Sequence, residues 1–271
     1  MTTTYDSPGT IGDLLTAELD AAKAAALEAG GILERHYRER GFEVAQKGKD
    51  NPVTTADFAA DQKLKEMLHG GFPHYGWLSE ETADDGARLG LRRVWIVDPL
   101  DGTKEFIKGI PEFVVAIALA EGGVPILGVT YNPVRHELFW CARGQGVYLN
   151  DERVGVTRRD SLVEATVLAS RSETSRGEWK AYEGLLKVDP IGSVAYKLAL
   201  VAAGRADATF TLTPKSEWDV AAGTALVTEA GGRVTDLSGR ELRFNKNSVK
   251  LPGFVATNGL IHEAIEMMLP R

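Results

Sequence analysis

The sequence predicts a layered fold of the α+β class, and three observations predict it. Helical patterns occupy much of the first 70 residues. Short apolar stretches separated by turn residues follow over 94–149, and helices and strands are mixed beyond residue 155. Helices set apart from a run of strands are typical of stacked α and β layers. We therefore expect stacked α and β layers, with a second portion of the chain beginning after Gly155.

Two helices are predicted before the strands begin. Apolar residues at spacings of three and four indicate a long amphipathic helix over 11–41, with Thr10 as its cap. A second helix is predicted over 54–70, where a glycine pair ends it, and its first turn carries Asp57. Its expected buried face consists of Ala60, Leu64, Met67 and Leu68.

The middle of the chain predicts an antiparallel meander. Its strand candidates are VWIVD, FVVAIALA, ILGVTY, HELFWC and GVYL. The segments between them, EGGVP, NPVR and ARGQG, are rich in turn-forming residues. Beyond Gly155, strands are predicted over 166–170, 206–212 and from 233, and helices over 193–203 and 220–230.

Composition narrows the class of protein. The 271 residues are 44% hydrophobic, enough for a sizeable core. A net charge of −7 argues against a nucleic-acid polymer as partner, because such proteins collect Lys and Arg, but it leaves a small phosphorylated ligand open. The single cysteine, Cys141, excludes an internal disulfide framework, so we expect a cytoplasmic protein. No apolar run is long enough to predict insertion into a membrane.

The stretch WIVDPLDGTKEF, residues 95–106, ends an apolar strand with two acids. Asp98 closes the strand, the proline after it favours a turn, and Asp101 occupies the fourth turn position, so both carboxylates can converge. Two anions so close need a shared proton or a cation, and hard oxygen ligands indicate magnesium, or manganese in its place. Gly102 and Thr103 then offer backbone N–H groups to phosphate oxygens.

Each acid in this pattern also has an ordinary structural interpretation. Asp-Pro-x-Asp-Gly forms good turns without any metal. Glu80, in WLSEET, is compatible with a solvated loop, and Asp57 and Asp219 are compatible with the first turns of helices, where acids are favoured. Only the joint arrangement of these acids favours a site.

Four stretches together resemble the inositol monophosphatase superfamily of magnesium-dependent, lithium-sensitive phosphatases. They are TTADFAAD with Asp57, SEE with Glu80, DPLDGT from Asp98 to Thr103, and WDVAAG with Asp219. The likeness continues through ARGQGVYLND, GSVAYKLALVAAGRAD and TEAGGRVTD. The resemblance implies a sugar-phosphatase-like sandwich of alternating α-β-α-β-α layers. The site would lie between an α+β part over 1–155 and a smaller α/β part over 156–271.

The resemblance also implies residue roles. The metal ions, Mg²⁺ with Mn²⁺ as a substitute, would be held by Glu80, Asp98, the carbonyl of Leu100, Asp101 and Asp219. The catalytic residues would be Asp57, Glu80 and Thr103, with Thr103 orienting the attacking water. The substrate would be held by Gly102, Thr103, Lys104, Ser170, Arg171, Gly192, Ser193, Lys197 and Asp219. The reaction would be metal-assisted in-line hydrolysis of a small phosphomonoester.

Within the superfamily, KEF at 104–106 and SRS at 170–172 resemble the bacterial 3'(2'),5'-bisphosphate nucleotidases, although Glu173 stands where those enzymes often have His. The resemblance implies hydrolysis of adenosine 3',5'-bisphosphate to AMP and phosphate. A second phosphate needs extra cations, for which Arg171 and Lys197 are candidates. Inositol 1-phosphate, histidinol phosphate and fructose 1,6-bisphosphate are the alternative substrates.

Two other interpretations belong to different classes. Haloacid-dehalogenase phosphatases also end a strand with aspartates before Gly-Thr, but their acids are two apart, whereas Asp98 and Asp101 are three apart. A non-catalytic inositol-phosphate or metal-binding protein on the same scaffold would be expected to lack Glu80 or Thr103, and both are present. The superfamily includes monomers and dimers, so a homodimer is compatible with the sequence.

Overall fold

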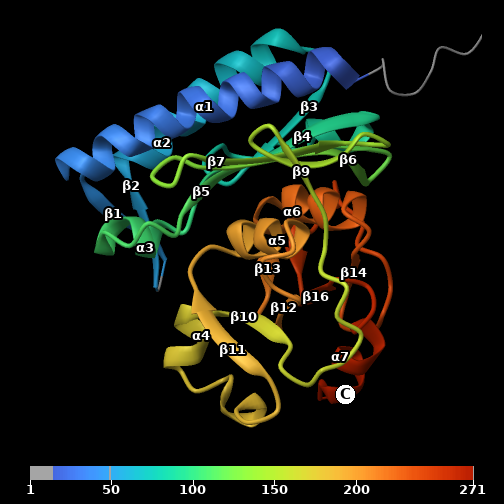
Figure 1. Ribbon diagram of the computed structural model, residues 1–271. Helices are drawn as coiled ribbons and strands as arrows, with labels where there is room; N and C mark the ends of the chain where they lie inside the picture. Colours follow the sequence, from blue (N-terminus) through green and yellow to red (C-terminus); the bar gives the residue numbers. More distant parts are fainter. Residues whose placement is uncertain (1–14, 49, 271) are drawn as a thin grey trace, which may run out of the picture.

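The computed structural model describes residues 15–48 and 50–270, and its helices and sheets alternate in layers (Figure 1). The helices are α1 (Thr16–Glu39), α2 (Thr55–Leu64), α3 (Thr103–Lys108), α4 (Arg171–Ser175), α5 (Val194–Ala202), α6 (Glu217–Glu229) and α7 (His262–Met268). Helices α1 and α2 cover one face of a seven-stranded sheet, and α5 and α6 cover the other (Figure 1). A five-stranded sheet follows, with α4 and α7 beyond it, so the predicted α-β-α-β-α order is confirmed.

The two predicted N-terminal helices are present. Helix α1 buries a face rich in alanine and leucine, and its predicted start and its cap at Thr10 lie outside the described residues. Helix α2 begins with a capping box, in which Thr54 and Asp57 bond each other's backbone N–H groups. A π-helical turn, Lys65–His69, then extends it to the glycine pair. That turn offsets the helical register, and Met67, expected to be buried, is only half-buried.

The predicted meander forms most of the seven-stranded sheet. In spatial order its strands are β3 (Gly76–Ser79), β4 (Arg93–Asp101), β5 (Val114–Glu121), β6 (Val124–Asn132), β7 (Glu137–Ala142), β8 (Gly146–Leu149) and β9 (Glu152–Val154). All neighbours pair antiparallel except β3, which adds to β4 in parallel. Alternate residues of β5 face α1 and α6, because Val115 and Ile117 pack with the first and Ala116 and Ala118 with the second. Burial on both faces explains the unbroken apolar runs.

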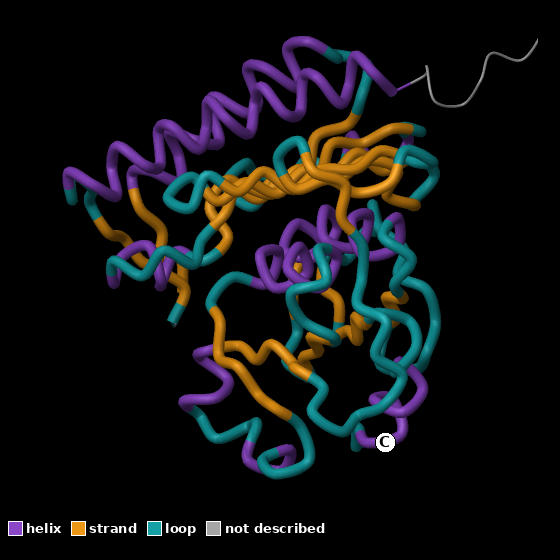
Figure 2. The backbone as a smooth tube through the Cα atoms, viewed as in Figure 1, coloured by secondary structure: helices purple, strands orange, loops and turns teal. Residues whose placement is uncertain are grey.

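The second sheet has the order β11 (Lys187–Ile191), β10 (Thr166–Ser170), β12 (Ala208–Thr211), β16 (Phe254–Thr257) and β14 (Arg233–Thr235). Residues 155–165 run from one sheet to the other (Figure 2). The division of the chain at residue 155 stays a prediction, although α5 and α6 share a core with the first sheet. Two short pairs complete the structure: β1 (Val44–Gly48) with β2 (Asn51–Thr54), and β13 (Lys215–Ser216) with β15 (Lys250–Leu251).

Two details of the second part differ from expectation. Helix α6 begins at Glu217 rather than at residue 220, because Ser216 and Asp219 form a capping box one turn earlier. The sequence did not predict β11, β16 or α7. None of the helices that the structure describes combines the length and the apolar character needed to cross a membrane.

Candidate metal and phosphate site

A cavity of about 270 Å³ opens where β4 ends. The β1–β2 hairpin, the start of α3 and the first turns of α5 and α6 contribute to its walls. It is lined by all but two of the predicted site residues: Glu80, Asp98, Leu100, Asp101, Gly102, Thr103, Lys104, Ser170, Gly192, Ser193, Lys197 and Asp219. The fold thus gathers residues from both parts of the chain, and the two predicted residues outside the lining are Asp57 and Arg171.

Three acids form the centre of this cavity. Carboxylate oxygens of Glu80, Asp98 and Asp219 all lie within 4.8 Å of one another. Local structure orients two of them: Asp98 Oδ1 accepts the Leu100 N–H at 2.9 Å, and Asp219 Oδ2 accepts the Ser216 N–H at 2.7 Å. Asp98 therefore stabilises its turn and Asp219 caps its helix, and both also belong to the acidic cluster.

The charges of the cluster oppose one another. Burial raises the pKa of Asp98 well above its usual value, and Glu80, Asp101 and Asp219 raise it further. Burial, with Asp101 and Glu80 next in importance, raises the pKa of Asp219 to about 7. A hard divalent cation would relieve this repulsion, and an all-oxygen donor set suits it. The residues present therefore fit a metal ion.

Asp101 lines the same cavity and is held by α5. Its Oδ2 accepts the Ser193 hydroxyl at 2.7 Å and the Ala195 N–H at 2.6 Å. Ser193, the N-cap of α5, has a φ of 60°, a strained value for a residue with a side chain. Lys197 Nζ donates to the Ser193 carbonyl at 2.8 Å. These bonds tie the strained turn to Asp101, so the geometry of the two parts is coupled at the site.

Thr103 connects the cavity to Asp57. The Thr103 hydroxyl lies 3.2 Å from Asp57 Oδ1 and 3.1 Å from the Leu100 carbonyl, and its one proton can go to either acceptor. Asp57 is buried behind it, and burial raises the pKa of Asp57. Gly102, with a φ of 104°, precedes Thr103, and a Cβ there would lie 2.8 Å from the Glu112 carbonyl oxygen. Only glycine fits this turn without strain.

Sequence reasoning missed a cation on the acidic cluster. Lys47 Nζ, from β1, lies 2.6 Å from Glu80 Oε1 and 2.7 Å from Glu81 Oε1. Burial raises the pKa of Glu81 to about 7 even though Lys47 opposes this shift. No local motif identifies Lys47, because the hairpin reaches the cluster only through the tertiary fold.

Arg171 is placed next to the cavity but directed elsewhere. Its Nη2 lies 2.7 and 2.6 Å from the two carboxylate oxygens of Glu112. The same carboxylate accepts the Gly192 N–H at 2.7 Å. Glu112 therefore pairs with Arg171 and fixes the residue just before the strained Ser193.

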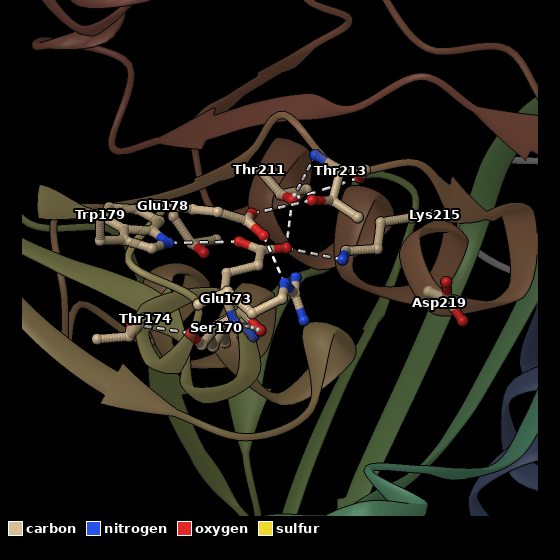
Figure 3. A network of polar contacts seen from close by, with 12 residues as sticks. Ser170, Glu173, Thr174, Glu178, Trp179, Thr211, Thr213, Lys215 and Asp219 are labelled. Carbon is tan, nitrogen blue, oxygen red and sulfur yellow. Dashed lines mark hydrogen bonds and ion pairs between the residues drawn. The ribbon is translucent and has the colours of Figure 1, made fainter. Parts of the chain in front are cut away.

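Glu173 and Lys215 form an ion pair at the edge of the cavity, and Figure 3 shows its polar contacts. Glu173 Oε1 accepts from Lys215 Nζ at 2.8 Å and from the Thr211 hydroxyl at 2.6 Å, and Oε2 accepts from Trp179 Nε1 at 3.3 Å. Although burial alone would raise the pKa of Glu173, Lys215 and these hydrogen bonds bring it below its usual value. Glu173 is not part of the cavity lining, whereas Lys215 is. Lys215, four residues before Asp219, could have been found from its place beside the WDVAAG stretch.

Comparison with known proteins agrees with this site. The model of the inositol monophosphatase family matches residues 15–268. An inositol-1-monophosphatase of Mesorhizobium japonicum is 38% identical over 259 residues, covering 92% of this chain and 95% of that protein. The extragenic suppressor protein suhB of Bartonella henselae has a TM-score of 0.82 at 34% identity, covering 94% of this chain and 99% of that one. CysQ of Bacteroides thetaiotaomicron has a TM-score of 0.76 at 32% identity, covering 91% and 98%. The chain therefore belongs to the inositol monophosphatase family and is a phosphatase acting on small phosphate esters.

Proposed function

We propose that this phosphatase uses Mg²⁺ and that its preferred substrate is adenosine 3',5'-bisphosphate, which it converts to AMP and phosphate. The observation that carries the proposal is the presence of three lysines, Lys104, Lys197 and Lys215, in the lining of the same cavity as the acids. Metal ions would neutralise the phosphate that is cleaved. Additional cations are needed when the substrate carries a second phosphate.

The metal would be held by the acidic cluster. Glu80, Asp98 and Asp219 offer only oxygen, and Mg²⁺ is commonly bound through carboxylates together with substrate phosphate. When bound, Mg²⁺ would neutralise charge on the phosphate and favour ionisation of the attacking water. The chain itself would orient that water through the Thr103 hydroxyl, with Asp57 as acceptor of the hydroxyl proton. The free N–H groups at the start of α3 would hold phosphate oxygens.

Two of the lysines, Lys197 and Lys215, carry charges that repel each other. Burial lowers the pKa of Lys197 to about 8, and the charge of Lys215 contributes to this shift although Asp101 opposes it. A phosphate between two mutually repelling ammonium groups would stabilise both. The Lys104 side chain forms no hydrogen bond or ion pair with any described residue, so its charge is available at the cavity.

The second phosphate is therefore assigned to the lysines and not to Arg171. The sequence predicted that Arg171 would hold that phosphate, but both oxygens of Glu112 already engage its guanidinium. We assign Arg171 a positioning role, through Glu112 and Gly192.

A second candidate substrate is inositol 1-phosphate. Serine hydroxyls from Ser170, Ser172 and Ser193 line the cavity, and no aromatic side chain occurs in its lining among the described residues. Such a surface suits the hydroxyls of a polyol better than the face of a purine. The Mesorhizobium relative named inositol-1-monophosphatase supports the same alternative.

A phosphate-release assay with Mg²⁺ would test the proposal. The substrates are adenosine 3',5'-bisphosphate, inositol 1-phosphate, histidinol phosphate and fructose 1,6-bisphosphate, each with the wild type, Lys197→Met and the exposed-lysine control Lys65→Met. We expect kcat/KM to be highest for the bisphosphate nucleotide. Lys197→Met should lower that value about tenfold or more, by loss of a charge-assisted hydrogen bond to the second phosphate. It should lower kcat/KM for inositol 1-phosphate by a smaller factor, because the only change shared by both substrates is the loss of the Lys197 bond to the Ser193 carbonyl. A higher wild-type kcat/KM for inositol 1-phosphate would transfer the assignment to the second candidate, and turnover that survives removal of metal by EDTA would contradict both.

A further inference from the structure

A second cavity, of about 400 Å³, shares no lining residue with the metal site. It is formed by the start of β6, the second half of α6, strand β14 and the loop after that strand. Neither the sequence motifs nor the family resemblance assigns it a role. Its volume would accommodate a small organic molecule.

The lining combines apolar walls with a cationic rim. Val124, Val234 and Leu242 supply apolar surface. The Arg233 side chain is exposed and forms no hydrogen bond or ion pair with any described residue. Arg243 is paired only with Glu241 among the described residues, at 3.5 Å and with both side chains more than half exposed, so this pair is weak. The chemistry fits a small anion that carries an apolar body.

A buried hydroxyl in the lining also lacks a partner. Thr224 is 8% exposed, and its Oγ1 has no hydrogen-bond partner among the described residues. A threonine inside a helix commonly donates to a carbonyl one turn earlier, but Thr224 does not. An unpaired buried hydroxyl is unfavourable, and a polar ligand atom that bonds it would offset that cost.

The cavity is joined to the metal site by α6. Thr224 lies five residues after Asp219 on this helix, which corresponds to about 7.5 Å along its axis. Helix α6 packs tightly against α5, because a Cβ on Gly223 would lie 2.3 Å from Leu198 Cβ. A second link comes from the Glu217 carboxylate in the first turn of α6, which accepts the N–H group of Asn245 at 2.6 Å, just beyond the cavity rim.

We propose that this cavity binds a small organic anion, a carboxylate or a phosphate on a short apolar body, and that its occupancy alters metal affinity at Asp219 through α6. A ligand that contacts Thr224 and draws in the rim arginine displaces a rigid helix whose first turn carries the metal ligand. Such coupling between two sites is reciprocal, so the metal must change the affinity for the anion by the same factor.

The test uses the metal-free full chain with labelled methyl groups, observed by NMR. The probes are butyrate and propyl phosphate, with 1-butanol as the uncharged control. We expect saturable shifts at the methyls of Val124, Val234 and Leu242 in the millimolar range. Arg233→Gln should weaken binding about fivefold or more by loss of a charge-assisted bond, whereas Arg240→Gln, which removes an exposed arginine paired with Asp236, should bind like the wild type.

Further outcomes decide the remaining parts of the proposal. Thr224→Val should lower the affinity for the anion and leave the fold intact, because valine has the shape of threonine but lacks the unpaired hydroxyl. Calorimetric Mg²⁺ affinity should change about fivefold when the better probe is saturating. No localised shift with either anion, or an equal response to 1-butanol, would overturn the anion site, and an unchanged Mg²⁺ affinity would overturn the coupling. Because binding is measured without substrate, these outcomes are independent of the substrate assignment.

Discussion

Removing one charged residue from the acidic cluster should stabilise the metal-free protein. In Asp219→Asn the amide oxygen can still accept the Ser216 N–H that caps α6, so the local structure is preserved while the charge is lost. Burial and neighbouring acids raise the pKa of Asp219 from 3.8 to about 7. At about 1.4 kcal/mol per pKa unit, ionisation costs about 4 kcal/mol above neutral pH. The Asp219 side chain is partly exposed and water screens its charge, so the cost of ionisation is about half of this value, ~2 kcal/mol.

The sign of the pH dependence follows from the raised pKa. The folded state holds the Asp219 proton more tightly than the unfolded state, so the wild type loses stability as pH rises from about 4 to about 7. Asp219→Asn lacks this loss. Thermal unfolding in EDTA should therefore give equal Tm values near pH 4 and a Tm for the variant about 4–8 °C higher at about pH 8. Saturating Mg²⁺ should reverse the order, because only the wild type keeps the full ligand set.

A matched control separates this effect from a general response to losing an aspartate. Asp236 lies in a turn, where hydrogen bonds from Ser238 and Arg240 outweigh burial and lower its pKa. Asp236→Asn should therefore gain no stability at high pH. Equal Tm values for the wild type and Asp219→Asn in EDTA at about pH 8 would refute the proposed repulsion within the cluster.

Variants at three other residues test individual roles. Asp98→Asn should lower kcat/KM about 10²-fold and weaken Mg²⁺ binding in calorimetry, because it removes charge from the centre of the acidic cluster. Near-normal values would indicate that Asp98 only stabilises its turn. In steady-state kinetics, Thr103→Ala should lower kcat about 10²-fold with little change in KM, because the Thr103 hydroxyl is proposed to orient the attacking water. A change confined to KM would contradict that role. Glu112→Ala should raise KM by releasing both Gly192 and Arg171, whereas Glu112→Gln, which can still accept the N–H group, should recover much of the loss; equal KM values for the two variants would argue against positioning.

Much of the fold could be predicted because its strongest signals are local. The helical spacing of α1 and the unbroken apolar runs of β4 to β7 reflect burial that each segment meets along its whole length. Strand β11 was missed because KVDPI is short, carries charges and contains a proline. Strand β16 and helix α7 are also short, with four and seven residues, and their neighbours in space decide their structure.

The candidate site also contains residues that local sequence predicts and residues that only the tertiary fold brings together. Asp98, Asp101 and Gly102 were predictable because one turn places them together, and the family resemblance added Glu80 and Asp219. Lys47 and Glu112 reach the site from segments without a local motif, and only the tertiary fold brings them there. The environment of Arg171 was unpredictable for the same reason, because its partner Glu112 lies 59 positions earlier in the chain.

The order of the proposed metal ligands along the chain has a consequence for synthesis of the protein. Glu80, Asp98 and Asp101 leave the ribosome long before Asp219, and α6, the helix that carries Asp219, also covers one face of the first sheet. A nascent chain that has reached residue 210 therefore has an incomplete ligand set and a sheet face that α6 does not yet cover. Since domains fold as their segments emerge, full metal affinity should appear together with the closing of that sheet, late in translation. Metal uptake would then mark the chains that have finished folding.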